Sequence, residues 1–256
     1  MTPWRDTGDL GPEEATIWQQ VEFGSYTADI ALWDELADTA DGPVLELGSG
    51  AGRVALHLAA RGSEVISVDR DAGLAAQLDA SAAERGVALT ILTADLASPG
   101  ELSPPAKPAL AIGPLHVIQV LDGASRPALF SRLAEVMKPG ATIALTVVDE
   151  STLLSAGAAA AQILPDMREI DGWVYSSEPL WLQVGDDVLT VRRVRERVSP
   201  DGRIERAVQD EVLHRVSPDR LGLEAEEAGL RVAGRRQIRS GPDEADSTVV
   251  ILEVPG

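Results

Sequence analysis

The sequence contains no cysteine, which excludes disulfide bonds and cysteine-ligated zinc. Lysine is nearly absent, because Lys107 and Lys138 are the only lysines and the other basic residues are arginines. No apolar run reaches the roughly 18 residues that a membrane span needs, and the first residues lack the basic and then apolar pattern of a secretory signal. We therefore expect a cytoplasmic protein with no membrane partner and no metal.

Positive charge is scarce as a whole: 22 Lys and Arg stand against 41 Asp and Glu, which gives a formal net charge of −19. Such a surface repels a phosphate backbone at long range, so we expect no nucleic-acid partner. A length of 256 residues suits one α/β domain with an insertion. Nothing in the sequence indicates an oligomeric state.

The first two thirds of the chain alternate between short apolar runs and helical patterns. The apolar runs predict five strands, over residues 43–47, 64–69, 88–93, 110–113 and 141–148. Repeated strand–helix–strand units predict a mostly parallel sheet with helices on both faces. Four prolines within residues 99–108 argue against a full helix there.

The remaining segments follow other patterns. We expect an N-terminal helical cap over residues 1–40, a sheet core over 41–150, an antiparallel insertion over 151–216, and a closing helix with the last two core strands over 217–256. Within the insertion, residues 173–184, 188–199 and 203–216 predict three long strands joined by glycine-containing turns.

A glycine-rich loop follows the first predicted strand and opens a helix. It contains Gly48, Ser49, Gly50 and Gly52, with Glu46 two residues before the first glycine. Glycines there let the backbone turn tightly and approach a ligand, and the N-terminus of the helix favours a negative group. A dinucleotide-binding motif would need a third glycine where Arg53 stands.

Two further acids follow the next two strands. Asp69 ends the second strand, where a carboxylate accepts hydrogen bonds from ribose hydroxyls, and Asp95 follows the third. Because the carboxyl ends of parallel strands share one edge, Glu46, Asp69 and Asp95 should face one crevice. The simpler alternatives are a helix cap for Asp69 and a turn residue for Asp95.

The loop and these acids resemble the class I, Rossmann-like S-adenosylmethionine-dependent methyltransferases, of the small-molecule type. The insertion resembles the lid of the branch that includes glycine N-methyltransferases. The resemblance implies a Rossmann-like α/β fold, with a seven-stranded mostly parallel sheet and a three-stranded antiparallel lid after the fifth strand. It also implies S-adenosylmethionine as cofactor, S-adenosylhomocysteine as product and a small-molecule methyl acceptor as partner.

The resemblance further implies roles for individual residues. Glu46 would orient the methionine end of the cofactor above a floor of Gly48, Ser49, Gly50 and Gly52, and Asp95 would accept from the adenine amino group beside Leu96. The other expected cofactor-binding residues are Tyr26, Arg53, Asp69, Arg70 and Gly113. Ala109 stands where the family often has an aspartate, so chemistry based on that acid is not expected.

Several candidates have a structural alternative of comparable weight. His116 is the candidate general base or substrate-orienting group, and its alternative is packing. Tyr26 or Arg53 would contact the methionine carboxylate, or else Tyr26 packs in the core and Arg53 is a solvated helix start.

The lid carries two patterned sets of side chains. Arg193, Arg195 and Arg197 alternate onto one face, where they would attract an acidic substrate or, as we favour, form a solvated outer face. Trp173, Tyr175 and Trp181 alternate onto one face of the preceding strand, as a pocket wall or, as we slightly favour, as packing.

The predicted function is transfer of a methyl group from S-adenosylmethionine to nitrogen or oxygen of a small molecule. Two alternatives are an NAD(P)-dependent oxidoreductase and a non-catalytic S-adenosylmethionine-binding protein. The sequence does not name the methyl acceptor, because fold-level analogy does not identify a substrate.

Overall fold

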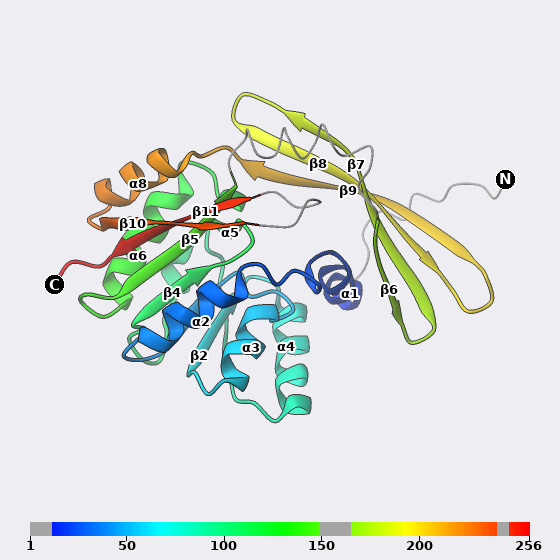
Figure 1. Cartoon of the computed structure of the whole chain (residues 1–256), viewed down its shortest axis with the longest axis horizontal. Helices are drawn as coiled ribbons and strands as arrows, with labels where there is room; N and C mark the ends of the chain where they lie inside the picture. Colours follow the sequence, from blue (N-terminus) through cyan, green and yellow to red (C-terminus); the bar gives the residue numbers. More distant parts are fainter. Residues whose placement is uncertain (1–11, 149–164, 240–245) are drawn as a thin grey trace.

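The computed structural model describes residues 12–148, 165–239 and 246–256, which form two sheets with helices around the larger one (Figure 1). The larger sheet has seven strands in the order β10-β11-β5-β4-β1-β2-β3, and the smaller has four in the order β6-β7-β8-β9. Among the described residues, no helix is long and apolar enough to cross a membrane.

The larger sheet is the Rossmann-like core expected from the sequence. Five strands are parallel: β1 (Val44–Leu47), β2 (Val65–Asp69), β3 (Thr90–Thr93), β4 (Leu110–Gly113) and β5 (Thr142–Val148). The last two, β11 (Ser247–Glu253) and β10 (Arg231–Ile238), add antiparallel strands beside β5. The predicted seven-stranded, mostly parallel sheet is therefore confirmed.

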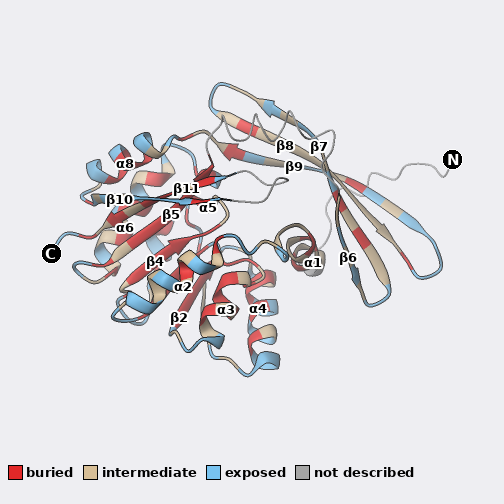
Figure 2. Ribbon diagram, viewed as in Figure 1, coloured by how far each residue is buried: buried red, intermediate tan, exposed pale blue. Residues whose placement is uncertain are grey.

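Helices cover both faces of this sheet, which is why its central strands are almost entirely buried (Figure 2). They are α2 (Ile30–Thr39), α3 (Arg53–Ala60), α4 (Ala72–Arg85), the short α5 (Val117–Val120), α6 (Ser125–Val136) and α8 (Pro218–Glu227). The proline-rich stretch forms only the three-residue 3₁₀ turn η1 (Pro99–Glu101), as its composition predicts. One core cluster packs α6 and α8 on one face, and another packs α2 and α3 on the opposite face.

Side-chain caps fix where two of these helices begin. Asp71 accepts hydrogen bonds from the backbone N–H groups of Gly73 and Leu74 at the start of α4, and Ser217 accepts one from Arg220 at the start of α8. Ser217 is thus the N-cap that the sequence predicts.

The smaller sheet contains the three predicted lid strands and one more. The predicted strands are β7 (Trp173–Val184), β8 (Val188–Val198) and β9 (Ile204–His214), and β6 (Asp166–Ile170) adds an edge strand beside β7. The sequence does not reveal β6 because it is only five residues long and exposes Met167 and Glu169. An edge strand needs neither an apolar face nor a long alternating pattern.

A β-bulge corrects the prediction that Trp173, Tyr175 and Trp181 share a face. Tyr175 pairs with Arg197, but the register shifts between Pro179 and Trp181, so that Trp181 pairs with Arg192. The extra residue moves every following side chain to the opposite face of the strand. Trp181 therefore lies on the outer face, under the guanidinium of Arg192.

The opposite face of the lid packs against α1 (Pro12–Phe23), which lies between the two sheets (Figure 1). Trp18 of α1 meets Tyr175 edge-on, with ring centroids 5.4 Å apart, and Val21 packs beside them. The slightly favoured interpretation of Tyr175 as packing is confirmed.

This contact also corrects the favoured interpretation of the lid arginines as a solvated outer face. Arg195 donates two hydrogen bonds to Glu22 of α1, each of 2.7 Å, and its guanidinium lies over Trp18. Arg197 pairs with Glu14 and Glu205, and Arg193 pairs with Asp166. Because Glu22 and Glu14 belong to α1, Arg195 and Arg197 join α1 to the lid, whereas Arg193 pairs within the lid.

Candidate functional site

The reversal of strand order in the larger sheet lies between β1 and β4. The chain runs from β1 outward to β2 and β3, and then returns to β4 on the other side of β1. Loops at the carboxyl ends of two such strands part from one another and leave a crevice where ligands bind. The glycine loop follows β1, and residues 114–116 follow β4, so both candidate segments border this point.

A cavity of about 440 Å³ opens there. The glycine loop forms one wall, and Pro114, Leu115 and Val117 form another. Gln19 and Phe23 of α1 and Glu211 of the lid enclose it from the remaining side. The cavity therefore lies where the core, α1 and the lid meet.

The loop needs glycine at its turning points. Gly48, Gly50 and Gly52 all have positive φ, at 67°, 52° and 83°. A Cβ on Gly48 would lie 2.4 Å from Val117 Cγ2, and one on Gly52 would lie 2.1 Å from Leu78 Cδ1. Both the backbone conformation and the close neighbours thus exclude larger side chains.

Asp69 is tied to this loop rather than to the next helix. Its Oδ2 accepts from the N–H of Gly50 at 2.8 Å, and its Oδ1 accepts from the N–H of Asp71 at 3.0 Å. The cap of α4 is Asp71 instead, so the alternative interpretation of Asp69 as the helix cap is wrong. The carbonyl of Asp69 also accepts from Ala94, which brings Asp69 and Asp95 to the same edge of the sheet.

Asp95 forms the turn that its alternative interpretation describes. Its Oδ1 accepts from the N–H of Ala97 at 2.9 Å, while the residue as a whole is exposed. Leu96 is buried and Arg70 is exposed. Asp69, Arg70, Asp95 and Leu96 do not line the 440 Å³ cavity but continue the same edge beyond it.

Glu46 is the most unusual acid of the site. It is 3% exposed, and its Oε2 is buried without a hydrogen-bond partner among the described residues. Burial raises the pKa of Glu46 to about 8, although nearby Arg53 opposes the shift. The hydroxyl of Ser49 is also buried and unpartnered within the described chain. Both residues line the cavity, where an entering ligand would supply the missing partners.

Arg53 is held by the segment between α1 and α2. Its guanidinium donates to both carboxylate oxygens of Asp29, at 2.7 and 2.6 Å, and to the carbonyl of Tyr26 at 3.0 Å. It also lies over the Tyr26 ring, 5.2 Å from the centroid. The alternative of a solvated helix start is therefore wrong for Arg53, and Tyr26 packs against the core.

His116 faces the core strand β11. It adopts a left-handed backbone conformation with φ 61°, and its Nε2 lies 2.9 Å from the hydroxyl of Ser247. Burial lowers the pKa of His116 to about 4, so its imidazole is neutral at pH 7. His116 does not line the cavity, although its neighbours Pro114, Leu115 and Val117 do.

Gln19 and Glu211 are among the cavity residues that the sequence analysis did not identify. Gln19 of α1 accepts a hydrogen bond of 2.6 Å from the N–H of Ala51, at the start of α3. Glu211 of β9 reaches the same cavity from the lid. Neither belongs to a local motif, because both are brought to the loop by contacts between distant segments.

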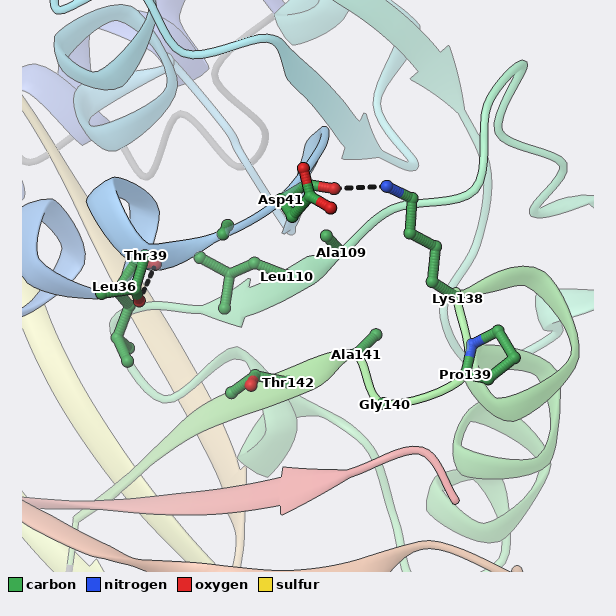
Figure 3. A pocket seen from close by; sticks show the side chains of 11 residues that line it. Leu36, Thr39, Asp41, Ala109, Leu110, Lys138, Pro139, Gly140, Ala141 and Thr142 are labelled. Carbon is green, nitrogen blue, oxygen red and sulfur yellow. Dashed lines mark hydrogen bonds between the residues drawn. The ribbon is translucent and has the colours of Figure 1, made fainter. Parts of the chain in front are cut away.

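A second cavity, of about 260 Å³, lies at the opposite edge of the sheet (Figure 3). It is lined by the starts of β4 and β5, and Lys138 donates from Nζ to the carbonyl of Asp41 at its rim. The ammonium of Lys138 already has a partner in the chain, and the cavity lies at the amino ends of the strands. The carboxyl-edge cavity is therefore the candidate site.

Residues 44–140 match the family described as a methyltransferase domain. The resemblance to class I, Rossmann-like methyltransferases that the sequence indicates is confirmed over these residues. The match spans β1 to the turn before β5, and so contains the glycine loop and all three acids. The predicted enzyme class is confirmed. A comparison with curated proteins gives no match.

Solved structures of similar fold cover nearly the whole chain. The S-adenosylmethionine-dependent methyltransferase of Clostridium acetobutylicum ATCC 824 matches with a TM-score of 0.72 at 12% identity, over 95% of this chain and 98% of that one. The sugar N-methyltransferase KedS8 of Streptoalloteichus sp. ATCC 53650 matches with 0.72 at 15% identity, over 100% and 98%. The CcbJ methyltransferase of Streptomyces caelestis matches with 0.63 at 20% identity, over 90% and 89%. These similarities establish the fold of the core together with that of the lid.

The cofactor prediction agrees with the same comparisons. Other matched structures contain S-adenosylmethionine or S-adenosylhomocysteine, among them the glycopeptide N-methyltransferase MtfA. S-adenosylmethionine as the cofactor is thus confirmed at the level of the family.

Proposed function

We propose that this protein transfers the methyl group of S-adenosylmethionine to nitrogen or oxygen of a small molecule, in the cavity between the glycine loop and the lid. The observation that carries the proposal is Glu46, whose buried Oε2 lacks a partner within the described chain, beside a loop of left-handed glycines. A carboxyl group in that state gains most from a cationic partner. The amino group of the methionine part supplies one.

The other expected contacts extend from Glu46 along the sheet edge. Ser49, with its unpartnered hydroxyl, supports the methionine part on the floor of the cavity together with Gly48 and Gly50, and Gly52 completes the turn of the loop. The carboxylate of Asp69 accepts a hydrogen bond from the N–H of Gly50. It has further lone pairs that would accept hydrogen bonds from the ribose hydroxyls. Asp95, beside the buried Leu96, would contact the adenine. The exposed Arg70 lies next to Asp69, and Gly113 ends β4 at the same edge of the sheet.

The remaining candidates act indirectly in this proposal. Arg53 is already paired with Asp29, so we assign to it the placement of the Tyr26 segment above the loop, together with its electrostatic effect on Glu46. His116 fixes the turn after β4 through Ser247. A pKa of about 4 makes it a poor acceptor for a substrate proton at neutral pH.

The chemistry needs positioning more than side-chain catalysis. The cofactor supplies a methyl group on a sulfonium, which is a good leaving group. The chain holds the acceptor in line with the methyl carbon and excludes water, and such orientation contributes several kcal/mol to a rate. The lid and α1 close the cavity on the side where an acceptor would bind.

Solved structures of the same fold support a small molecule as the methyl acceptor. One is a sugar N-methyltransferase, another an amino pentose methyltransferase and another a glycopeptide N-methyltransferase. A formal charge of −19 also disfavours a nucleic-acid acceptor.

The test is transfer of a radiolabelled methyl group from S-adenosylmethionine to a panel of small amines and alcohols. We expect label in at least one product, with one S-adenosylhomocysteine released for each methyl group transferred. Binding of the cofactor with no transfer to the panel or to a metabolite extract would support the non-catalytic alternative. The oxidoreductase alternative requires binding of NAD or NADP, and Arg53 replaces the third glycine that such a loop uses.

A further inference from the structure

Glu211 is a carboxylate of the cavity that has no partner within the described chain. It lies on β9, opposite Val191 of β8, on the face of the lid that meets α1. It is partly buried and lines the same cavity as Glu46 and Gly48. Because β9 also lies against α5, Glu211 stands over the crevice from the lid side.

The other carboxylates on this face are all engaged. Glu22 of α1 accepts two hydrogen bonds from Arg195 and one from Ser177. Asp166 of β6 pairs with Arg193, and Glu14 of α1 pairs with Arg197. Glu211 makes no hydrogen bond or ion pair with the residues that the structure describes, so its charge is left for a ligand.

The charges around Glu211 come from three elements. Arg193 and Arg195 of β8 attract Glu211, but each already forms an ion pair with another carboxylate. The carboxylate of Glu22 repels Glu211. Arg168 of β6 lines the same cavity, with its guanidinium against Gly24. Burial raises the pKa of Glu211 above its usual range, which the adjacent arginines oppose. A desolvated carboxylate of this kind favours a cation that can also donate hydrogen bonds.

We propose that Glu211 binds the protonated amino group of the methyl acceptor and takes its proton, so that the acceptor is an amine. This inference rests on the proposed function and adds the acceptor class to it. An ammonium group is a much stronger acid than an alcohol, so a carboxylate deprotonates an amine acceptor far more readily.

The step is balanced without any further reactant. Glu211 accepts one proton from the ammonium, which frees the nitrogen lone pair. That lone pair forms a bond to the methyl carbon, and the electron pair of the breaking C–S bond stays on sulfur as a neutral thioether. The product leaves as a methylated ammonium, and Glu211 releases its proton to solvent.

The test uses sinefungin, an analogue of S-adenosylmethionine that carries a primary amine where the cofactor has its transferable methyl group. We expect sinefungin to bind the wild-type protein, and Glu211→Gln to weaken that binding about tenfold through loss of one charge-assisted hydrogen bond. Binding of S-adenosylhomocysteine, which lacks this amine, should change less than about twofold. Both affinities are measured by calorimetry at pH 7.

Asp210→Asn is the matched control, because Asp210 neighbours Glu211 on β9 but pairs with Arg192 on the outer face. It should leave both affinities unchanged. Glu211→Asp keeps the charge and should bind sinefungin better than Glu211→Gln does, which separates loss of charge from misfolding.

The outcomes separate this inference from the proposed function. If wild type binds neither ligand, the proposed function fails, and the inference fails with it. If S-adenosylhomocysteine binds but Glu211→Gln weakens both ligands equally, or neither, Glu211 is not an amine-binding group. Methyl label recovered on alcohols and not on their matched amines would also overturn the inference.

Discussion

The side-chain carbonyl of Gln19 accepts a hydrogen bond of 2.6 Å from the backbone N–H of Ala51, so α1 is fastened directly to the glycine loop. The loop can come this close to α1 because residue 50 is glycine: a Cβ there would lie 2.2 Å from Gln19 Oε1. The contact makes α1 part of the wall of the cavity.

Gln19→Ala should lower the free energy of unfolding by about 1 kcal/mol, because it removes the acceptor of a partly buried N–H. Urea denaturation measures the change. Gln209→Ala, at an exposed position of β9, is the control and should lie within about 0.5 kcal/mol of wild type. Equal effects of the two substitutions would mean that the contact with Ala51 adds nothing to stability.

The raised pKa of Glu46 predicts a proton release when S-adenosylhomocysteine binds. Free Glu46, with a pKa of about 8, is mostly protonated at pH 7, and the amino group of the ligand would stabilise the carboxylate and lower that pKa. Affinity should therefore rise as pH rises from 6 toward 8. Calorimetry in buffers of different ionisation enthalpy detects the released proton. Glu46→Gln should abolish the release, and a wild-type affinity independent of pH would contradict this account.

The same shift has a consequence for stability. Because the folded pKa of Glu46 lies above the model-compound value of 4.5, the folded protein is favoured at low pH, and that advantage is lost as pH rises through about 8. Glu46→Gln should remove this contribution. The difference in unfolding free energy between the variant and wild type should therefore grow in favour of the variant from pH 5 to pH 8, measured by chemical denaturation.

Two arginine–carboxylate pairs on β8 test how α1 is joined to the lid. Arg195 and Glu22 form a largely buried pair, with side chains 18% and 4% exposed, whereas Arg192 and Asp210 are each 39% exposed. Arg195→Ala should cost about 2 kcal/mol of unfolding free energy, while Arg192→Ala should cost less than about 1 kcal/mol. Equal losses in denaturation experiments would show that the α1 contact is no stronger than a surface pair.

His116 should affect stability at acid pH rather than catalysis. Its pKa in the folded protein is about 4, below the ordinary value of 6.5, so the unfolded chain binds a proton at a higher pH than the folded protein does. The free energy of unfolding should therefore decrease as pH falls from 6.5 toward 4. His116→Asn removes this titration, and asparagine tolerates the positive φ. The variant should lose less stability than wild type between pH 7 and pH 4. A loss as large as that of wild type would contradict the assignment.

The core of the fold was predictable because its signals are local. Buried parallel strands appear as short apolar runs, and the glycines of the loop are separated by only one residue each. The prediction that Asp69 lies at the edge of the sheet likewise depended only on the strand that Asp69 ends. Ser217 could be placed as a cap because a serine before a proline marks a helix start.

The contacts between distant segments were not predictable in this way. Alternation places Arg195 on a face of the lid, but it cannot show that Glu22, 173 residues away in the chain, covers that face. The β-bulge after Pro179 places the side chain of Trp181 on the opposite face of the strand, and no glycine in the sequence indicates a bulge there. Gln19 and Glu211 reach the cavity only because α1 and the lid pack over the core.

The central claim is tested most directly by calorimetric titration of the purified protein with S-adenosylhomocysteine, with NAD and NADP as parallel controls. The account predicts one site of about micromolar affinity for S-adenosylhomocysteine, strongly weakened in Asp69→Ala, and no binding of either dinucleotide. Asp71→Ala, which removes the cap of α4 but leaves the Asp69 carboxylate, is the control and should retain binding. Binding of NAD or NADP without binding of S-adenosylhomocysteine would contradict the account.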